Sequence, residues 1–221
     1  MSSRYFKSRV EAGEKLAAIL VPKYRHKDCA IIALSDGGVM VGAQIAMKLH
    51  CVLTMLLTAP ITLPREPEAV AVIDQSGNFT FNSAYSDGEI DELQGEFRNY
   101  IDQQRLQKLH DINSLIGHGG VIRRDLVNRR IVIIVNDGLT GGFALDAVAQ
   151  FLKPIQINKL VVATPLANVP AVDKMHVIAD EIVCLNVVYD YMNTEHYYEA
   201  NDVPDHKATL KIIQDIVLHW Q

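Results

Sequence analysis

The amino-acid sequence predicts an α/β protein with a doubly wound, mainly parallel sheet and one inserted β-hairpin with a long helix. Three observations predict this fold. Two strand–turn–helix–strand units bracket the chain, at residues 29–57 and 131–164. Their strands are short apolar runs, which is typical of strands covered on both faces. The segment between the units has the hairpin and helix pattern. Strands that alternate with helices favour a parallel sheet between two helical layers.

The first unit follows an amphipathic helix. Apolar residues recur at helical spacing from Arg9 to Leu20, and Cys29 to Leu34 form a short apolar run. Residues 35–38 break that run. Val39 to Leu49 then have one apolar face, and Cys51 to Leu57 form a second apolar run. The pattern predicts helix, strand, turn, helix and strand in that order.

A β-hairpin and a long helix are expected in the middle of the chain. Ala69 to Ile73 and Asn78 to Phe81 flank the turn residues 74–77. Ser86 and Glu89 have the spacing of a capping box, and apolar residues follow at helical spacing to about His110. The two patterns therefore predict a β-hairpin followed by one long helix.

A long connection precedes the second unit. Residues 111–128 contain Gly117-His118-Gly119-Gly120, and connections of this length in compact domains are often mobile lids. No linker or repeat interrupts the chain. We therefore expect residues 1–221 to form a single domain, with the hairpin, helix and lid inserted at about 65–128.

The second unit holds the most informative motif. Ile131 to Val135 form a buried strand, Asn136 and Asp137 follow at its end, and Phe143 to Leu152 continue at helical spacing. Further strands are expected at Lys159–Thr164 and Glu181–Val187, with a terminal helix over Asp205–Trp220.

The turn in this motif is rich in glycine. It runs through Gly138, Leu139, Thr140, Gly141 and Gly142. Glycine lets the backbone approach a ligand, and a helix N-terminus favours an anion. The turn has the features of a phosphate cradle, although an ordinary strand–turn–helix connection has the same pattern.

Ligands of doubly wound sheets bind beyond the carboxyl ends of the strands. Four segments are expected at such ends: Ser35–Gly38, Thr58–Ile61, Asn136–Gly142 and Thr164–Val169. Their common location predicts one shared site.

Composition excludes several function classes. The chain has 221 residues, 49% of them hydrophobic, and a formal net charge of −5 with dispersed basic residues. We therefore expect no nucleic-acid partner and no membrane partner. The N-terminus lacks an apolar signal region, and the three cysteines (Cys29, Cys51 and Cys184) are scattered. Both features favour a cytoplasmic protein with cysteines in its core.

The motif Asn136–Gly142 resembles the ribose-phosphate signature of type I phosphoribosyltransferases. In that family two consecutive acids end a hydrophobic strand and hold the ribose hydroxyls, and a Thr/Gly loop holds the 5-phosphate. The whole chain is most similar to a bacterial group of predicted phosphoribosyltransferases.

The resemblance assigns roles to residues of this chain. Asp137 and Asn136 would be the catalytic pair that binds the ribose hydroxyls, and residues 138–142 would hold the phosphate. Ser35, Asp36, Gly37 and Gly38 would frame the pyrophosphate. Mg²⁺ would hold the diphosphate, with Asp137 contributing indirectly. The partner would be phosphoribosyl diphosphate or a nucleoside monophosphate, and the protein would be a homodimer.

The chain departs from the family pattern at several positions. Asn136 replaces the first acid, Asp36 stands where the group carries arginine, and Thr58-Ala59 replace an Arg-Lys pair. Two like charges 4 Å apart repel by about 4 kcal/mol at an effective dielectric of about 20. Asp36 therefore disfavours a diphosphate unless Mg²⁺ lies between them.

Three functions follow from these observations. The first is an enzyme that transfers ribosyl 5-phosphate between pyrophosphate and a nitrogenous base. The second is a nucleotide- or ribose-phosphate-binding regulatory module of the same fold, which the departures favour. The third, a flavodoxin-like nucleotide-binding protein, is disfavoured by the hairpin insertion. The sequence does not identify the base, and Tyr191, Tyr197 and Tyr198 could stack on it, pack internally or contact a second subunit.

Overall fold

The structure is a computed structural model that describes residues 5–64, 66, 69–116, 122 and 124–220. Its centre is a five-stranded sheet in the order β2-β1-β6-β7-β8, and every strand pair in it is parallel. The strands are β1 (Cys29–Ala33), β2 (Val52–Met55), β6 (Ile131–Val135), β7 (Lys159–Asn168) and β8 (Glu181–Val188). The predicted parallel sheet is confirmed.

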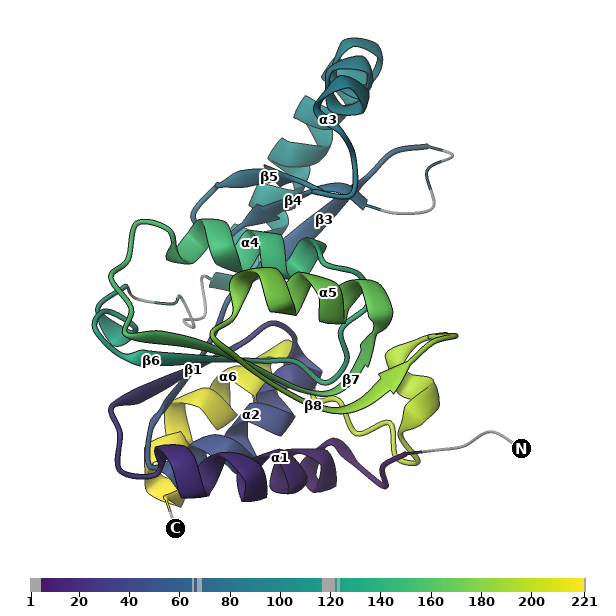
Figure 1. Ribbon diagram of the computed structural model, residues 1–221. Helices are drawn as coiled ribbons and strands as arrows, with labels where there is room; N and C mark the ends of the chain where they lie inside the picture. Colours follow the sequence, from purple (N-terminus) through teal and green to yellow (C-terminus); the bar gives the residue numbers. More distant parts are fainter. Residues whose placement is uncertain (1–4, 65, 67–68, 117–121, 123, 221) are drawn as a thin grey trace.

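Helices cover both faces of this sheet (Figure 1). The helices are α1 (Arg9–Tyr24), α2 (Asp36–Leu49), α4 (Phe143–Leu152), α5 (Val169–Ile178) and α6 (His206–Asp215). Three of them, α1, α2 and α6, lie on one face, and α4 and α5 lie on the other.

Alternation along the strands builds the two halves of the core. In β1, Ile31 packs with α1 and α2, whereas Ile32 packs with α4 and its neighbours. In β6, Ile133 and Ile134 divide in the same way. Successive side chains of a strand point to opposite faces, so an unbroken apolar strand requires a helical layer on each side.

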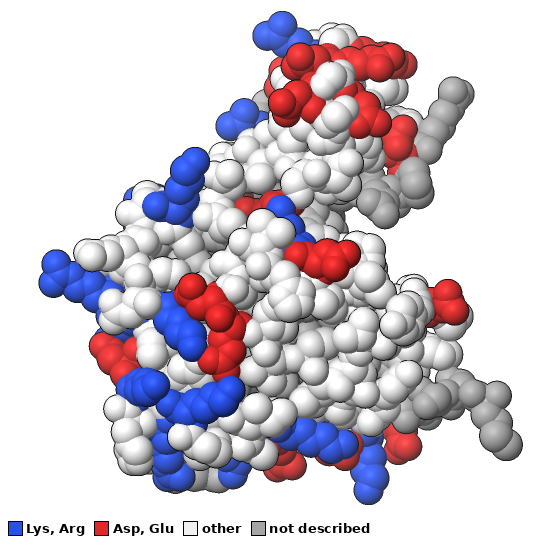
Figure 2. All heavy atoms as spheres, viewed as in Figure 1, with Lys and Arg blue, Asp and Glu red and all other residues white. Residues whose placement is uncertain are grey.

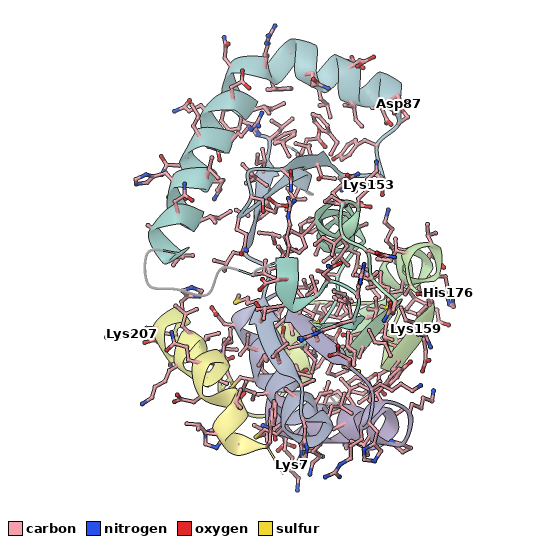
Figure 3. All side chains as sticks on the ribbon, turned by 90° about the vertical axis from the view of Figure 1, so that its left-hand side faces the viewer. Lys7, Asp87, Lys153, Lys159, His176 and Lys207 are labelled. Atoms are coloured by element: carbon pink, nitrogen blue, oxygen red, sulfur yellow. The ribbon has the colours of Figure 1, made fainter. Side chains whose placement is uncertain are left out.

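A second, antiparallel sheet lies outside the central one (Figure 1). It has the order β3-β4-β5, with β3 at Thr58–Thr62, β4 at Ala69–Asp74 and β5 at Phe79–Phe81. The long helix α3 (Asp87–Ile116) packs on it and kinks at Phe97, where the backbone is non-helical. Figure 3 shows α3 standing apart from the central sheet. The predicted hairpin and long-helix insertion are confirmed.

The predicted ends of several elements agree with the structure. Strand β6 and helix α4 begin and end at the predicted residues. The capping box also forms, since the Ser86 N–H donates to Glu89 Oε2 at 2.8 Å.

Other predicted boundaries were wrong. The turn expected at Ser35–Gly38 is the N-cap and first turn of α2, because the Ser35 hydroxyl accepts a hydrogen bond from the Gly38 N–H. The strand expected to end at Thr164 continues to Asn168, because β8 pairs with it along that length. The segment Thr58–Ile61, expected beyond the end of a strand, forms most of strand β3.

Shorter elements complete the chain. Helix α5 has no counterpart in the sequence-based prediction, and short 3₁₀ turns lie at Arg124–Leu126, Thr194–Tyr197 and Ile216–His219. The terminal helix is shorter than expected, since α6 ends at Asp215 and the last of these turns follows it. Among the described residues, no helix has the length and apolar character needed to cross a membrane.

Candidate functional site

The candidate site lies where the carboxyl ends of β1 and β6 meet. These strands are neighbours in the sheet, but the chain continues from them in opposite directions. After β1 it goes to β2 at one edge, and after β6 it goes to β7 on the other side. Such a reversal of winding opens a crevice that binds ligands in doubly wound folds. Ser35 follows β1, and Asn136 and Asp137 follow β6, so the structure brings these two predicted segments together.

The glycine-rich turn forms a tight connection from β6 to α4. The Leu139 N–H donates to Leu166 O at 2.9 Å, and Gly141 has a φ of +70°, a left-handed conformation that favours glycine. The Gly141 N–H donates to the Asn168 side chain at 3.0 Å. Gly142 is the N-cap of α4, and no side chain caps this helix end. The positive end of α4 is therefore available to an anion.

A cavity of about 440 Å³ adjoins this turn. Its lining combines the turn, the start of α5 and the antiparallel sheet. The lining residues are Pro60, Thr62, Ala69, Asn82, Ala84, Thr140, Gly141, Gly142, Phe143, Asn168 and Pro170. This cavity is large enough for a sugar phosphate, and none of its lining residues is charged. Neither the Ser35–Gly38 segment nor the Asn136–Asp137 pair is part of the lining.

Lys174 is a cation beside the turn that sequence analysis did not identify. Its aliphatic stem lies 2.9 Å from the position that a Cβ on Gly142 would occupy. Its ammonium group forms an ion pair with Asp146 and donates to the Ser83 hydroxyl at 2.9 Å. Lys174 lies on α5, which was not predicted. Asn168 and Pro170 are the signals that could have located that helix, since asparagine is a common N-cap and proline is common in a first turn.

Asp137 is enclosed by partners from distant parts of the chain. Its Oδ2 accepts from Arg9 Nε at 2.7 Å, and its Oδ1 lies 2.9 Å from the Ser35 hydroxyl. The Tyr198 hydroxyl donates to its backbone carbonyl at 2.6 Å. The side chain is only 10% exposed, so these partners enclose most of it.

Asn136 is also held by neighbouring groups. Its Oδ1 lies 2.6 Å from the Ser35 hydroxyl, and its Nδ2 donates to Gly138 O at 2.7 Å. Ser35 thus contacts Asn136 and Asp137 and also caps α2. The side chain that ends β1 fixes both polar residues that end β6.

The predicted pyrophosphate segment is packed closely against β6. A Cβ on Gly37 would lie 2.1 Å from Asp137 Oδ2, and one on Gly38 would lie 3.0 Å from Asn136 Oδ1. These glycines therefore permit a close approach of two elements. The Gly38 N–H is engaged by Ser35, and the Asp36 carboxylate lies 3.2 Å from His206 Nδ1.

The aromatic cluster near the C-terminus packs on the site. A Cβ on Gly138 would lie 2.1 Å from the Tyr191 hydroxyl, and Tyr191 and Tyr197 are in ring contact. Burial raises the pKa of Tyr191 to about 12 and raises the pKa of Tyr198 as well. Both hydroxyls are therefore protonated at neutral pH. Tyr197 and Tyr198 are buried, which favours the packing interpretation for them.

The remaining predicted residues lie on β3, in the core or outside the described residues. Thr58 and Ala59 are on β3 of the antiparallel sheet. The predicted lid, Gly117–Gly120, lies outside the described residues. Cys29 and Cys51 are buried in the core, and burial raises the pKa of Cys29 to about 11 and that of Cys51 to about 12. Neither thiol is a nucleophile at neutral pH.

The described residues do not form a magnesium site of their own. Within the described part of the chain, no three His, Cys, Asp or Glu side chains are grouped to hold a metal ion. Both Asp137 oxygens are engaged by Arg9 and Ser35. Mg²⁺ commonly binds one or two carboxylates together with substrate phosphates, so the ion would have to arrive with a ligand.

Comparison with known proteins finds two relatives in sequence. The chain is 28% identical over 185 residues to two proteins of Mycobacterium tuberculosis, each named "Putative phosphoribosyl transferase". The chain resembles the phosphoribosyltransferases in sequence. The match covers 82% of this chain and 40% of each relative, so the chain spans less than half the length of the curated relatives. No protein-family model matches the chain.

Solved structures with the same fold cover nearly the whole chain. The TT1426 protein of Thermus thermophilus superposes with a TM-score of 0.70 at 22% identity, over 97% of this chain and 98% of that one. A Neisseria gonorrhoeae protein with bound ppGpp superposes with a TM-score of 0.51 at 12% identity, over 96% of this chain and 97% of that one. These two solved structures thus share the α/β fold of the chain over nearly its whole length.

Proposed function

We propose that this protein is a phosphoribosyltransferase, which transfers ribosyl 5-phosphate between pyrophosphate and a nitrogenous base. The observation that carries the proposal is the turn Gly138–Gly142. It ends at a helix without a side-chain cap, contains a left-handed glycine and lines a cavity of about 440 Å³. The relatives named phosphoribosyl transferase support the same reaction class.

The 5-phosphate would bind at the start of α4. Backbone N–H groups and the helix dipole favour a dianion there. The Thr140 side chain is exposed at the cavity and would donate to a phosphate oxygen. Lys174 lies beside Gly142 and adds a positive charge, although Asp146 offsets part of it.

The ribose would extend from this phosphate toward the end of β6. Asp137 and Asn136 would then hold its hydroxyls, and Ser35–Gly38 would face the pyrophosphate. In the reaction the C1–O bond to pyrophosphate breaks while the bond from C1 to the base nitrogen forms. The protein would act by positioning the reactants and by stabilising positive charge on the sugar.

Calorimetric titration tests the proposal. The ligands are phosphoribosyl diphosphate, ribose 5-phosphate and a nucleoside monophosphate, each with and without Mg²⁺. The informative variant is Thr140→Glu, and Thr140→Gln is its uncharged control of equal size. A carboxylate beside a phosphate costs up to about 4 kcal/mol before screening, so we expect Thr140→Glu to weaken binding at least about tenfold and Thr140→Gln to change it little.

The outcomes separate the functions. Binding that is lost in Thr140→Glu alone supports the phosphate site, and release of pyrophosphate with a suitable base supports the transferase. Binding without turnover over a broad set of bases would instead favour a nucleotide-binding regulatory module of this fold. No binding of any of the three ligands would contradict both. We also propose that the protein is a homodimer and is cytoplasmic. Gel filtration with light scattering would test the homodimer.

A further inference from the structure

Arg9 is the most deeply buried charged side chain near the site. It is the first residue of α1 and is 1% exposed, although arginine is rarely buried without a partner. Its Nε donates to Asp137 at 2.7 Å, and its Nη1 lies 3.4 Å from Asp202. Its guanidinium lies over the Tyr198 ring, 4.6 Å from the centroid. The shorter contact makes Asp137 the principal partner.

The pair fixes the position of the Asp137 carboxylate. Arg9 holds Oδ2, Ser35 holds Oδ1, and Gly37 leaves space for the carboxylate against the first turn of α2. Tyr198 anchors both members, since its ring contacts Arg9 and its hydroxyl binds the Asp137 carbonyl. The carboxylate is therefore held in one orientation, and 10% of the Asp137 side chain remains exposed.

A carboxylate held in this way can distinguish one sugar from another. A hydroxyl of the ligand that reaches this carboxylate gains a charge-assisted hydrogen bond, and a ligand without that hydroxyl does not gain it. This discrimination between sugars depends on a fixed orientation of the carboxylate. A carboxylate that rotated freely would bind water in place of the missing hydroxyl.

We propose that Arg9 is a positioning residue that sets the sugar specificity of the site, through its hold on Asp137. Arg9 does not touch the ligand. It makes the site prefer ribose 5-phosphate to 2-deoxyribose 5-phosphate. This inference rests on the proposed function, because it assumes that a sugar phosphate binds at the Gly138–Gly142 turn.

The test compares the two sugar phosphates by calorimetry. We expect the wild-type protein to bind ribose 5-phosphate at least about tenfold more tightly than 2-deoxyribose 5-phosphate, because one hydrogen bond to a charged group contributes about that much. The quantity compared between variants is the ratio of the two dissociation constants. In Arg9→Gln we expect this ratio to fall to nearly one, while 2-deoxyribose 5-phosphate still binds through its phosphate. A purely structural role would weaken both ligands equally and leave the ratio unchanged.

Two further variants complete the experiment. Arg9→Lys keeps the buried positive charge, so it should fold even where Arg9→Gln does not. Because lysine lacks the guanidinium geometry, this variant should give a lower ratio of the two dissociation constants than the wild-type protein. Lys15→Gln removes an exposed charge from the same helix, where Lys15 pairs with Glu11, and should leave the ratio unchanged.

The possible failures are distinct. A wild-type ratio retained in both Arg9 variants overturns the inference and leaves the phosphate site standing. A wild-type ratio near one also overturns it, since Asp137 then recognises no hydroxyl. If the wild-type protein binds neither sugar phosphate, the proposed function is overturned and the inference falls with it.

Discussion

At the scale of single residues, the site is shaped by what its glycines contact. Gly37 and Gly138 leave room for Asp137 and Tyr191, which a Cβ would meet at 2.1 Å in each case. Gly141 has open space around it and instead supplies a positive φ. The same residue type thus has two roles here, close packing at the first two positions and backbone conformation at the third.

Gly37→Ala should destabilise the protein. The added methyl group would displace Asp137 or Arg9, and overpacking of this kind costs about 1–3 kcal/mol. The free energy of unfolding, measured with urea, should fall by that amount. Gly95→Ala is the matched control, because its Cβ would meet open space on α3. Alanine there should be neutral or stabilising by up to about 1 kcal/mol. An unchanged stability of Gly37→Ala would contradict the close packing.

At the scale of elements, polar networks join helices to the sheet at both strand ends. At the amino end, Glu181 on β8 accepts from Lys159 on β7 at 2.7 Å and from Lys23 and Tyr24 on α1 at 2.7 and 2.6 Å. These contacts lower the pKa of Glu181 to about 2, with the bond from Lys159 as the largest cause. At the carboxyl end, Arg9 on α1 and Ser35 at α2 converge on Asp137.

Glu181→Gln should reduce stability in a pH-dependent way. A carboxyl whose folded pKa is lowered stabilises the protein above its ordinary pKa of about 4.5, and this contribution disappears as the pH falls toward 2. Because the carboxylate is partly exposed, we expect a difference on the order of 1–2 kcal/mol at pH 7. Urea unfolding between pH 7 and 3 would measure it. A constant difference over that range would argue against the ionic contribution, and Glu14→Gln on the exposed side of α1 serves as control.

At the scale of the whole molecule, the antiparallel sheet and α3 form a second layer of structure beside the core (Figure 1). This unit packs on α4, and the Ser83 hydroxyl donates to Asp146 on α4 at 2.9 Å. Lys174 on α5 contacts both residues. Acidic side chains gather on the part of the surface formed by α3, and most visible basic ones lie elsewhere (Figure 2). Ser83, Asp146 and Lys174 therefore form a polar contact between this unit and the core.

Asp146→Asn should loosen this attachment. The substitution removes the ion pair with Lys174 and weakens the contact with Ser83. Amide hydrogen exchange in β3, β4 and β5 should become about tenfold faster, since regions of low local stability open independently of the core. Exchange in β1 and β6 should not change. Asp173→Asn on the exposed side of α5 is the control, and equal acceleration in both sheets would contradict a local attachment.

Much of this fold could be predicted from the sequence because its signals are local. The bounds of β6 and α4 follow from an unbroken apolar run and a glycine-rich turn, and the start of α3 follows from Ser86 and Glu89. The hairpin follows from turn residues between two apolar runs. Each pattern extends over a few residues, and the backbone preferences that it reflects act over the same range.

Only the tertiary structure decided how the candidate site is assembled. Arg9 and Asp137 are 128 positions apart, and no local pattern marks arginine at a helix start as the partner of a distant carboxylate. Lys174 likewise reaches the turn only through packing between elements, since its stem lies beside Gly142. By itself the sequence determined the parallel sheet and the glycine-rich turn, because periodicity and turn chemistry are local. The pairing of buried charges was decided by which side chains the fold brings together, since a buried charge needs a partner wherever the chain supplies one.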